Sequence, residues 1–144
     1  MALGRGFKRE KGKKYNNTKV EYNGIKFDSK KEMQRYLVLK DAEDKGMISD
    51  LRLQVKYELI PSIKEEYIEH LKTKDKVKTR TLQLPITYTC DFQYTKNGEL
   101  VIEDVKASPK MLPKEFTLKE KLLFWRYGIK IRKIYKEKDS IWFW

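Results

Sequence analysis

Residues 88–106 read YTCDFQYTKNGELVIEDVK, and this stretch decides the fold around it. Asn97 and Gly98 stand between two alternating runs. They predict a tight β-hairpin, because both central residues of the favoured two-residue turn need a positive φ. With these two residues as the loop, pairing continues along both strands until Asp91 lies directly opposite Asp104. The turn and the pairing therefore predict an acidic pair on neighbouring strands.

Successive side chains of a strand point to opposite faces of the sheet, so Asp91 points away from the face that Cys90 and Phe92 share. Cys90 is therefore predicted to pack in the core rather than to act as a nucleophile. It is the only cysteine in the chain. A single cysteine excludes an intramolecular disulfide framework and indicates a reducing compartment.

On the partner strand, Asp104 and Lys106 share the face of Asp91, and Glu103 points to the other face. Like charges opposite each other destabilise a sheet, so the acidic pair predicts a cation between the two carboxylates. Mg²⁺ is the natural candidate, since it binds one or two carboxylates together with water and phosphate. Such ions polarise a phosphodiester and help to generate hydroxide, and Lys106 could orient that water or neutralise developing charge. The alternative is an ordinary exposed hairpin face with a cross-strand salt bridge.

Composition favours a polyanionic partner. The chain has 144 residues, a net charge of +12 and 40% hydrophobic residues, which fits one domain with a core of its own. The charge favours nucleic acid ahead of a membrane surface, although basic structural proteins share it. No run is long enough for a transmembrane helix, and the start lacks the apolar core of a signal peptide, so we expect a cytoplasmic protein.

The first nineteen residues form a basic segment, with seven basic residues against the single acid Glu10. We expect residues 1–19 to be a flexible arm that lies along phosphates when nucleic acid is bound. The alternative is a solvated tail that only aids solubility. The candidate nucleic-acid contacts in this arm are Lys8, Arg9, Lys13 and Lys14.

Residues 20–144 are predicted to form a single domain of the α/β (mixed α+β) class, with a central mixed sheet flanked by helices. The expected elements are an N-terminal hairpin at 20–27, a helix at 30–45, a strand at 51–59, the paired strands around 91 and 104, a helix from Pro113 to Gly128, and strands at 129–135 and 141–144. Residues 62–80 are mostly charged and are predicted to form a long exposed excursion with a short helix near Tyr67.

Both helices are predicted to bury one apolar stripe. In the first helix the stripe consists of Met33, Tyr36, Leu37 and the stem of Lys40, widened by Leu39 and Ala42. In the second helix the residues predicted to face inward are Phe116, Leu118, Leu122, Leu123 and Trp125.

An acid on one strand, a hairpin and then Asp104-x-Lys106 on the next strand resemble the PD-(D/E)XK nuclease superfamily. More narrowly, residues 24–32, Leu53-Gln54 and the two acidic motifs resemble small phage-encoded proteins of that superfamily, which are compared with Holliday-junction resolvases. The resemblance covers about residues 15–135. Two departures stand out: Cys90 occupies the position of the usual proline, and Asp104 replaces the usual glutamate.

The resemblance implies a restriction-endonuclease-like αβββαβ core and a Mg²⁺-dependent endodeoxyribonuclease, with Mn²⁺ as a substitute ion. It implies DNA as the partner, including branched replication or recombination intermediates, in the cytoplasm of a bacterial host. It also implies a homodimer, because resolving a junction requires two symmetric cuts. Glu32 matches a first-helix glutamate that completes the metal site in many members of the superfamily.

Several candidates have two interpretations. Glu32 is either a third metal ligand or the partner of Ser29 in a capping box, bonded to the Ser29 backbone amide. Gln54 contacts phosphate or metal, or is a plain polar strand residue. Lys119 and Lys121 bind phosphate or cover a solvated helix face. His70 has no neighbouring ligands in the sequence and is predicted to lie on the surface, so a zinc site is not expected.

Three function classes follow from these patterns. The first is a metal-dependent DNA endonuclease with Asp91, Asp104, Lys106 and Glu32 in its active site. The second is a catalytically inactive nucleic-acid-binding module on a nuclease-like scaffold. The third is a basic structural or RNA-binding protein. Metal-dependent cleavage separates the first class from the other two, whereas steep salt dependence of binding is common to all three.

Overall fold

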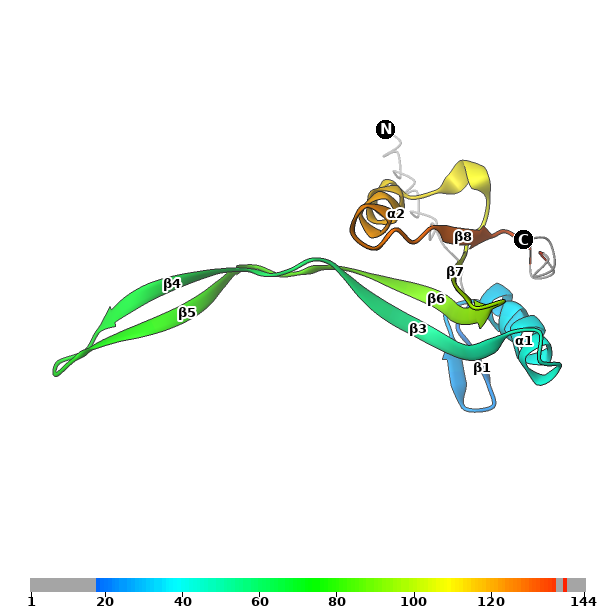
Figure 1. Ribbon diagram of the computed structural model, residues 1–144, viewed down its shortest axis with the longest axis horizontal. Coiled ribbons are helices and arrows are strands. Elements are labelled where there is room, and N and C mark those ends of the chain that lie inside the picture. The colour runs from blue at the N-terminus through cyan, green and yellow to red at the C-terminus, as the bar shows by residue number, and fades with distance from the viewer. Residues whose placement is uncertain (1–17, 137–138, 140–144) are drawn as a thin grey trace, which may run out of the picture.

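The computed structural model describes residues 18–136 and residue 139. Its centre is a four-stranded mixed sheet in the order β3-β6-β7-β8 (Figure 1). The strands are β3 (Ser49–Ile60), β6 (Ile86–Lys96), β7 (Glu99–Val105) and β8 (Ile131–Ile134). β3, β6 and β7 are antiparallel neighbours, and β8 runs parallel to β7. The predicted α/β (mixed α+β) class with a central mixed sheet is confirmed.

The remaining elements of the body come before and after the central hairpin. They are β1 (Val20–Tyr22), β2 (Ile25–Phe27), α1 (Lys30–Asp44), the 3₁₀ turn η1 (Pro109–Met111) and α2 (Lys114–Tyr127). β1 and β2 pair as the predicted N-terminal hairpin. Most of the basic arm, with Lys8, Arg9, Lys13 and Lys14, and the predicted strand at 141–144 lie outside the described residues.

The hairpin of β6 and β7 has the predicted turn and register. Asn97 and Gly98 both have positive φ, at 51° and 79°, and Lys96 pairs with Glu99. Pairing continues one residue at a time as far as Phe92 and Glu103. The predicted Asp91–Asp104 pair lies one step beyond the last paired residues.

Two hydrophobic clusters cover opposite faces of the sheet, because the neighbours Val101 and Ile102 of β7 belong to different clusters and must point to opposite faces. The α1 cluster is Phe27, Leu39, Ala42, Ile48, Phe92, Tyr94 and Val101. The α2 cluster is Leu59, Tyr88, Cys90, Ile102, Phe116, Leu123 and Ile131.

The predicted alternation along β6 is wrong at one point. Phe92 packs in the α1 cluster, but Cys90 packs in the α2 cluster and not beside Phe92. The register brings Asp91 opposite Gln54, whose φ of 52° lies in the left-handed region. A residue in that region breaks the pleat of a strand, so the two strands change the faces of their side chains together at this point. Cys90 is nonetheless buried in the core, as predicted.

The predicted helix stripes are only partly correct. Leu37, Leu118 and Trp125 are exposed, whereas the fully buried polar residue of α1 is Arg35. Arg35, Leu39 and Ala42 follow the spacing of one helix face, and a buried acid on the sheet balances the charge of Arg35. The helical periodicity therefore predicted part of the buried face of α1 correctly. It does not show which apolar residues pack against another surface.

The charged excursion forms strands rather than a helix. β4 (Ile63–His70) and β5 (Asp75–Gln83) pair antiparallel with each other, and they pair with no other described strand. Tyr67 pairs with Lys78 in this ladder, so the predicted short helix near Tyr67 is wrong. The two strands, called the ribbon below, extend the β3–β6 pair far beyond the body of the protein (Figure 1). Among the described residues, no helix has the length and apolar character needed to cross a membrane.

Candidate active site at the end of the central hairpin

β6 and β7 separate at Asp91. In place of a backbone carbonyl of β6, the Asp91 carboxylate accepts a hydrogen bond from the Val105 amide at 2.7 Å. At the same level β7 is paired with β8, where Val105 lies opposite Ile134, and the next amide, of Lys106, donates to the Ile134 carbonyl at 2.8 Å. The Asp91 side chain thus substitutes for main-chain pairing, and its carboxylate lies between β6 and β7.

Asp104 lies beside this point and is almost completely buried. The Tyr88 hydroxyl donates to its Oδ2 at 2.7 Å, and Lys106 Nζ lies 2.8 Å from its Oδ1. Lys106 Nζ also lies 4.0 Å from the centre of the Phe116 ring of α2. The lysine is therefore held between a carboxylate and an aromatic wall that excludes water from one side.

The carboxylates of the site carry more negative charge than the neighbouring groups neutralise. Burial, together with the charges of Asp104 and Glu32, raises the pKa of Asp91 from its usual 3.8 to about 7, although the Val105 amide and Lys106 oppose this change. The pKa of Glu32 is also raised, mainly by burial. A cation close to Asp91 would stabilise its ionised form.

Glu32 has the predicted capping geometry, with one difference. Ser29 Oγ accepts a hydrogen bond from the Glu32 amide at 3.1 Å, and Glu32 Oε2 accepts one from the amide of Asp28, at 3.3 Å, rather than from that of Ser29. The same end of α1 is tied to β7, since Lys31 Nζ donates to the Lys106 carbonyl at 3.1 Å. The Glu32 carboxylate held by this cap is close enough to Asp91 for its charge to help raise the pKa of Asp91.

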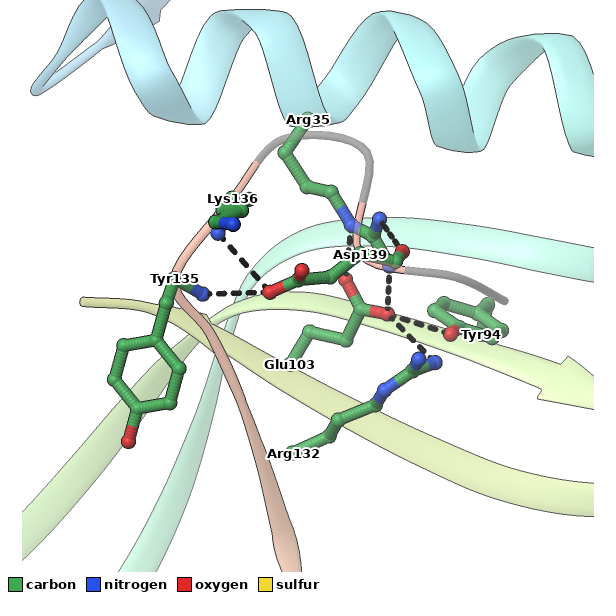
Figure 2. A network of polar contacts seen from close by, with 7 residues as sticks. All are labelled: Arg35, Tyr94, Glu103, Arg132, Tyr135, Lys136 and Asp139. Atoms are coloured by element: carbon green, nitrogen blue, oxygen red, sulfur yellow. Dashed lines mark hydrogen bonds and ion pairs between the residues drawn. The ribbon is translucent and has the colours of Figure 1, made fainter. Parts of the chain in front are cut away.

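Glu103 belongs to a different network on the α1 face (Figure 2). Arg35 of α1 binds both of its oxygens, with Nε at 2.8 Å and Nη2 at 2.6 Å. The Tyr94 hydroxyl donates to it at 2.7 Å, and Arg132 of β8 lies 3.5 Å away. Figure 2 also shows Arg35 bonded to the Asp139 carbonyl. Glu103 is thus bound by two arginines and a tyrosine, and it is directed away from Asp104, as the alternation predicted.

Gln54 is brought to the site by its unusual backbone. Its Nε2 donates to Asp91 Oδ1 at 3.4 Å, and its φ of 52° is uncommon for a residue other than glycine. Such strain persists only where the surrounding structure enforces it, and it is concentrated at functional sites.

Tyr88 and Arg35 were not among the site residues predicted from the sequence. Tyr88 fixes Asp104, and Arg35 holds Glu103 on the other face. A weak signal exists only for Arg35, whose spacing to Leu39 and Ala42 places a cation on the buried stripe of α1. Tyr88 carries no such signal, because its position depends on the change of faces at Asp91.

A pocket of about 390 Å³ opens over Asp104 and Lys106. Tyr88, Phe116 and Lys119 also line it, and the role of Lys119 in binding phosphate stays a prediction. Lys119 is paired with Glu115 at 2.9 Å.

Three other residues considered from the sequence do not line the pocket over Asp104 and Lys106. Lys121 lines two other hollows and not this pocket. His70 is exposed on the ribbon beside Asp75. Burial raises the pKa of the Cys90 thiol to about 11, which makes it a poor nucleophile.

The donor set suits a metal ion that keeps part of its water shell. Within residues 18–136 and 139, no group of three or more histidine, cysteine, aspartate or glutamate side chains is arranged to hold a metal ion. Asp91 and Asp104 alone would supply two carboxylates, and Mg²⁺ accepts such a pair together with water and phosphate. The role of Glu32 as a third ligand stays a prediction.

Comparison with known proteins identifies the family. A family model described as a protein of unknown function (DUF1064) matches residues 12–140. The chain belongs to the DUF1064 family. The matched residues include every element from α1 to β8, and these elements surround the acidic site of this DUF1064 protein. Neither the curated proteins nor the solved structures gave a match.

Proposed function

We propose that this protein is a metal-dependent endonuclease that hydrolyses phosphodiester bonds of DNA. The observation that carries the proposal is the meeting of Asp91, Asp104 and Lys106 at the point where β6 and β7 separate. The order α1-β3-β6-β7-α2-β8 is also the αβββαβ order that the resemblance to PD-(D/E)XK nucleases implies, and this agreement supports the proposal.

Asp91 and Asp104 would hold Mg²⁺ or Mn²⁺, with Glu32 as an additional ligand. The ion would polarise the phosphodiester and lower the pKa of a bound water. Lys106 already has its ammonium group beside Asp104, where it can neutralise charge that develops on the phosphate. Lys119 at the mouth of the pocket would bind a neighbouring phosphate, and Gln54 would orient the Asp91 carboxylate.

The net charge of +12 supports nucleic acid as the substrate. We infer that the protein acts in the cytoplasm on branched replication or recombination intermediates, as a homodimer. These finer points rest on the resemblance to Holliday-junction-resolvase-like proteins, since the pocket itself distinguishes neither branched from linear DNA nor DNA from RNA.

One observation favours a second candidate function, a nucleic-acid-binding module without catalysis. Both carboxylate oxygens of Asp104 already have partners in Tyr88 and Lys106. A metal ion would have to share Asp104 with these groups. A protein that uses the Asp104–Lys106 ion pair only to hold the hairpin end would bind DNA and leave it intact.

The deciding experiment is cleavage of labelled linear, flap and four-way-junction DNA with Mg²⁺, Mn²⁺ or EDTA. We expect cleavage only with a metal ion, and we expect Asp104→Asn to reduce it by at least about a hundredfold, since it removes a charged group that acts in the transition state. Lys106→Met is expected to reduce cleavage while the protein still binds DNA.

Two neighbouring carboxylates provide matched controls. Glu99→Gln changes an exposed acid on the same strand and should leave cleavage unchanged. Glu103→Gln changes the residue next to Asp104 but on the opposite face, and its folded fraction should cleave normally. Binding without cleavage by the wild-type protein would establish the binding module instead, and full cleavage by Asp104→Asn would show that Asp104 is not part of the active site.

A further inference from the structure

The ribbon has no partner within the part of the chain that the structure describes. β4 and β5 pair only with each other, and they point away from the body (Figure 1). An isolated two-stranded hairpin is only marginally stable in water. Residues 63–83 therefore form a long extension that lacks a core of its own.

The two faces of the ribbon differ in chemistry. One face carries two ion pairs, Arg80 with Glu65 and Lys78 with Glu69. On the other face Ile68 lies opposite Val77, and these side chains are 57% and 65% exposed. Aliphatic side chains paired in this way on an open ribbon are typical of a surface that packs against another protein.

An apolar groove lies at the base of the ribbon. It has a volume of about 730 Å³, and its walls come from the end of β3 and from the outer face of α2, with Ile60, Pro61, Leu118, Leu122 and Trp125. Trp125 is 77% exposed. This is the part of α2 that the sequence predicted to be buried, and within the described residues nothing covers it.

Charges beside the two apolar surfaces are complementary. Glu66 lies two residues before Ile68, on the same face of the ribbon, and it makes no ion pair with the described residues. Lys121 lines the groove, and it also makes none with them. A ribbon placed in the groove could bring these opposite charges together at the rim of an apolar contact.

We propose that a second copy of this chain covers the groove with its ribbon, so that two protomers exchange ribbons in a symmetric dimer. Ile68 lies five residues along the ribbon from Ile63, which is roughly 17 Å at about 3.4 Å per residue. A two-fold axis that crosses the ribbons between these points would place the Ile68–Val77 pair of each copy over the groove of the other. The same two surfaces then serve both protomers, as an isologous interface requires.

The exposed Ile68–Val77 pair favours a protein partner over nucleic acid. Residues 63–83 contain six basic and four acidic residues, so the positive charge per residue of this segment is about that of the chain as a whole. The cations of β5 are largely paired with the glutamates of β4. The inference does not depend on nuclease chemistry, because its test measures assembly and not cleavage.

The test is the mass of the full-length protein by sedimentation velocity over a wide range of concentration. We expect a dimer for the wild type. Val77→Lys on the ribbon and Trp125→Ala in the groove should each weaken the dimer by at least about tenfold. Both residues are highly exposed, so circular dichroism should show that both variants fold. Thr73→Lys, in the turn at the tip of the ribbon, adds the same charge outside the apolar pair and should leave the dimer unchanged.

A charge exchange tests the contact more directly. Glu66→Lys alone and Lys121→Glu alone should each weaken the dimer, and the double variant should restore it, because opposite charges would face each other again. A wild-type monomer at all concentrations would overturn the proposal. A dimer that these variants leave unchanged would also overturn it. If the variants instead weakened binding to labelled duplex DNA, the ribbon would be a nucleic-acid contact.

Discussion

Asp91 occupies a position where its ionised form is unfavourable without a cation. Its carboxylate is held by the Val105 amide, but it lies among other carboxylates in a buried place, and its pKa is raised from 3.8 to about 7. In the unfolded chain the same group ionises near its usual pKa. Between these two pH values the folded protein binds a proton that the unfolded chain has released, so folding is favoured at the acidic end of this range.

The sign of this linkage predicts how the stability of the protein changes with pH when EDTA keeps metal ions away from the site. The stabilisation linked to Asp91 should be complete below about pH 4 and should be lost as the pH rises through about 7. Asp91→Asn removes the ionisation, so relative to wild type it should gain up to about 4 kcal/mol in the free energy of unfolding between pH 4 and pH 8. Urea unfolding at pH 4, 6 and 8 measures this difference.

Mg²⁺ serves as the control for this prediction. The ion should raise the stability of wild type at pH 8 and have little effect on Asp91→Asn, because binding to the carboxylate requires its ionised form. Parallel pH profiles for the two proteins would show that Asp91 titrates normally in the folded state.

At the scale of elements, the turn between β6 and β7 fixes which residues meet at the site. Asn97 and Gly98 set the register, and the strands then separate at Asp91. A side chain at Gly98 would meet no atom within 4 Å. Glycine is therefore favoured here only because the backbone has a φ of 79°, which other residues rarely adopt.

Gly98→Ala should thus cost about 1–2 kcal/mol in the free energy of unfolding, from backbone strain alone. Asn97→Gly keeps a residue that tolerates positive φ and should change stability much less. Both are measured by urea unfolding. Since the core anchors the strands, the Gly98→Ala protein should cleave DNA normally once folded. An unchanged stability would mean that the turn adopts another geometry.

At the scale of the whole molecule, the charge of +12 is unevenly distributed along the chain. Residues 1–17 contribute six basic residues and one acidic residue. Contacts with phosphate release counterions from DNA, so each contact steepens the dependence of affinity on salt. The N-terminal segment should therefore strengthen DNA binding without taking part in the chemistry.

Deletion of residues 1–17 should reduce the slope of log affinity against log salt by up to about 4, corresponding to about five phosphate contacts. Fluorescence anisotropy with labelled DNA at several salt concentrations measures the slope. The rate of cleavage at saturating DNA should stay the same. As a control, full-length protein with the six basic residues changed to glutamine should behave like the deletion. An unchanged slope would assign the segment to solubility.

The sequence by itself determined the central hairpin, its register, the two helices and the face that Asp104 and Lys106 share. These features depend on turn chemistry and periodicity, which act between residues that are close along the chain. Only the tertiary structure decided the partners of Tyr88, Arg35 and Gln54, because each contacts a residue far away in the sequence. It also decided the change of faces at Cys90, the exposed side of α2 and the form of the ribbon. Periodicity indicates that a face is apolar, but burial depends on whether another surface lies opposite that face.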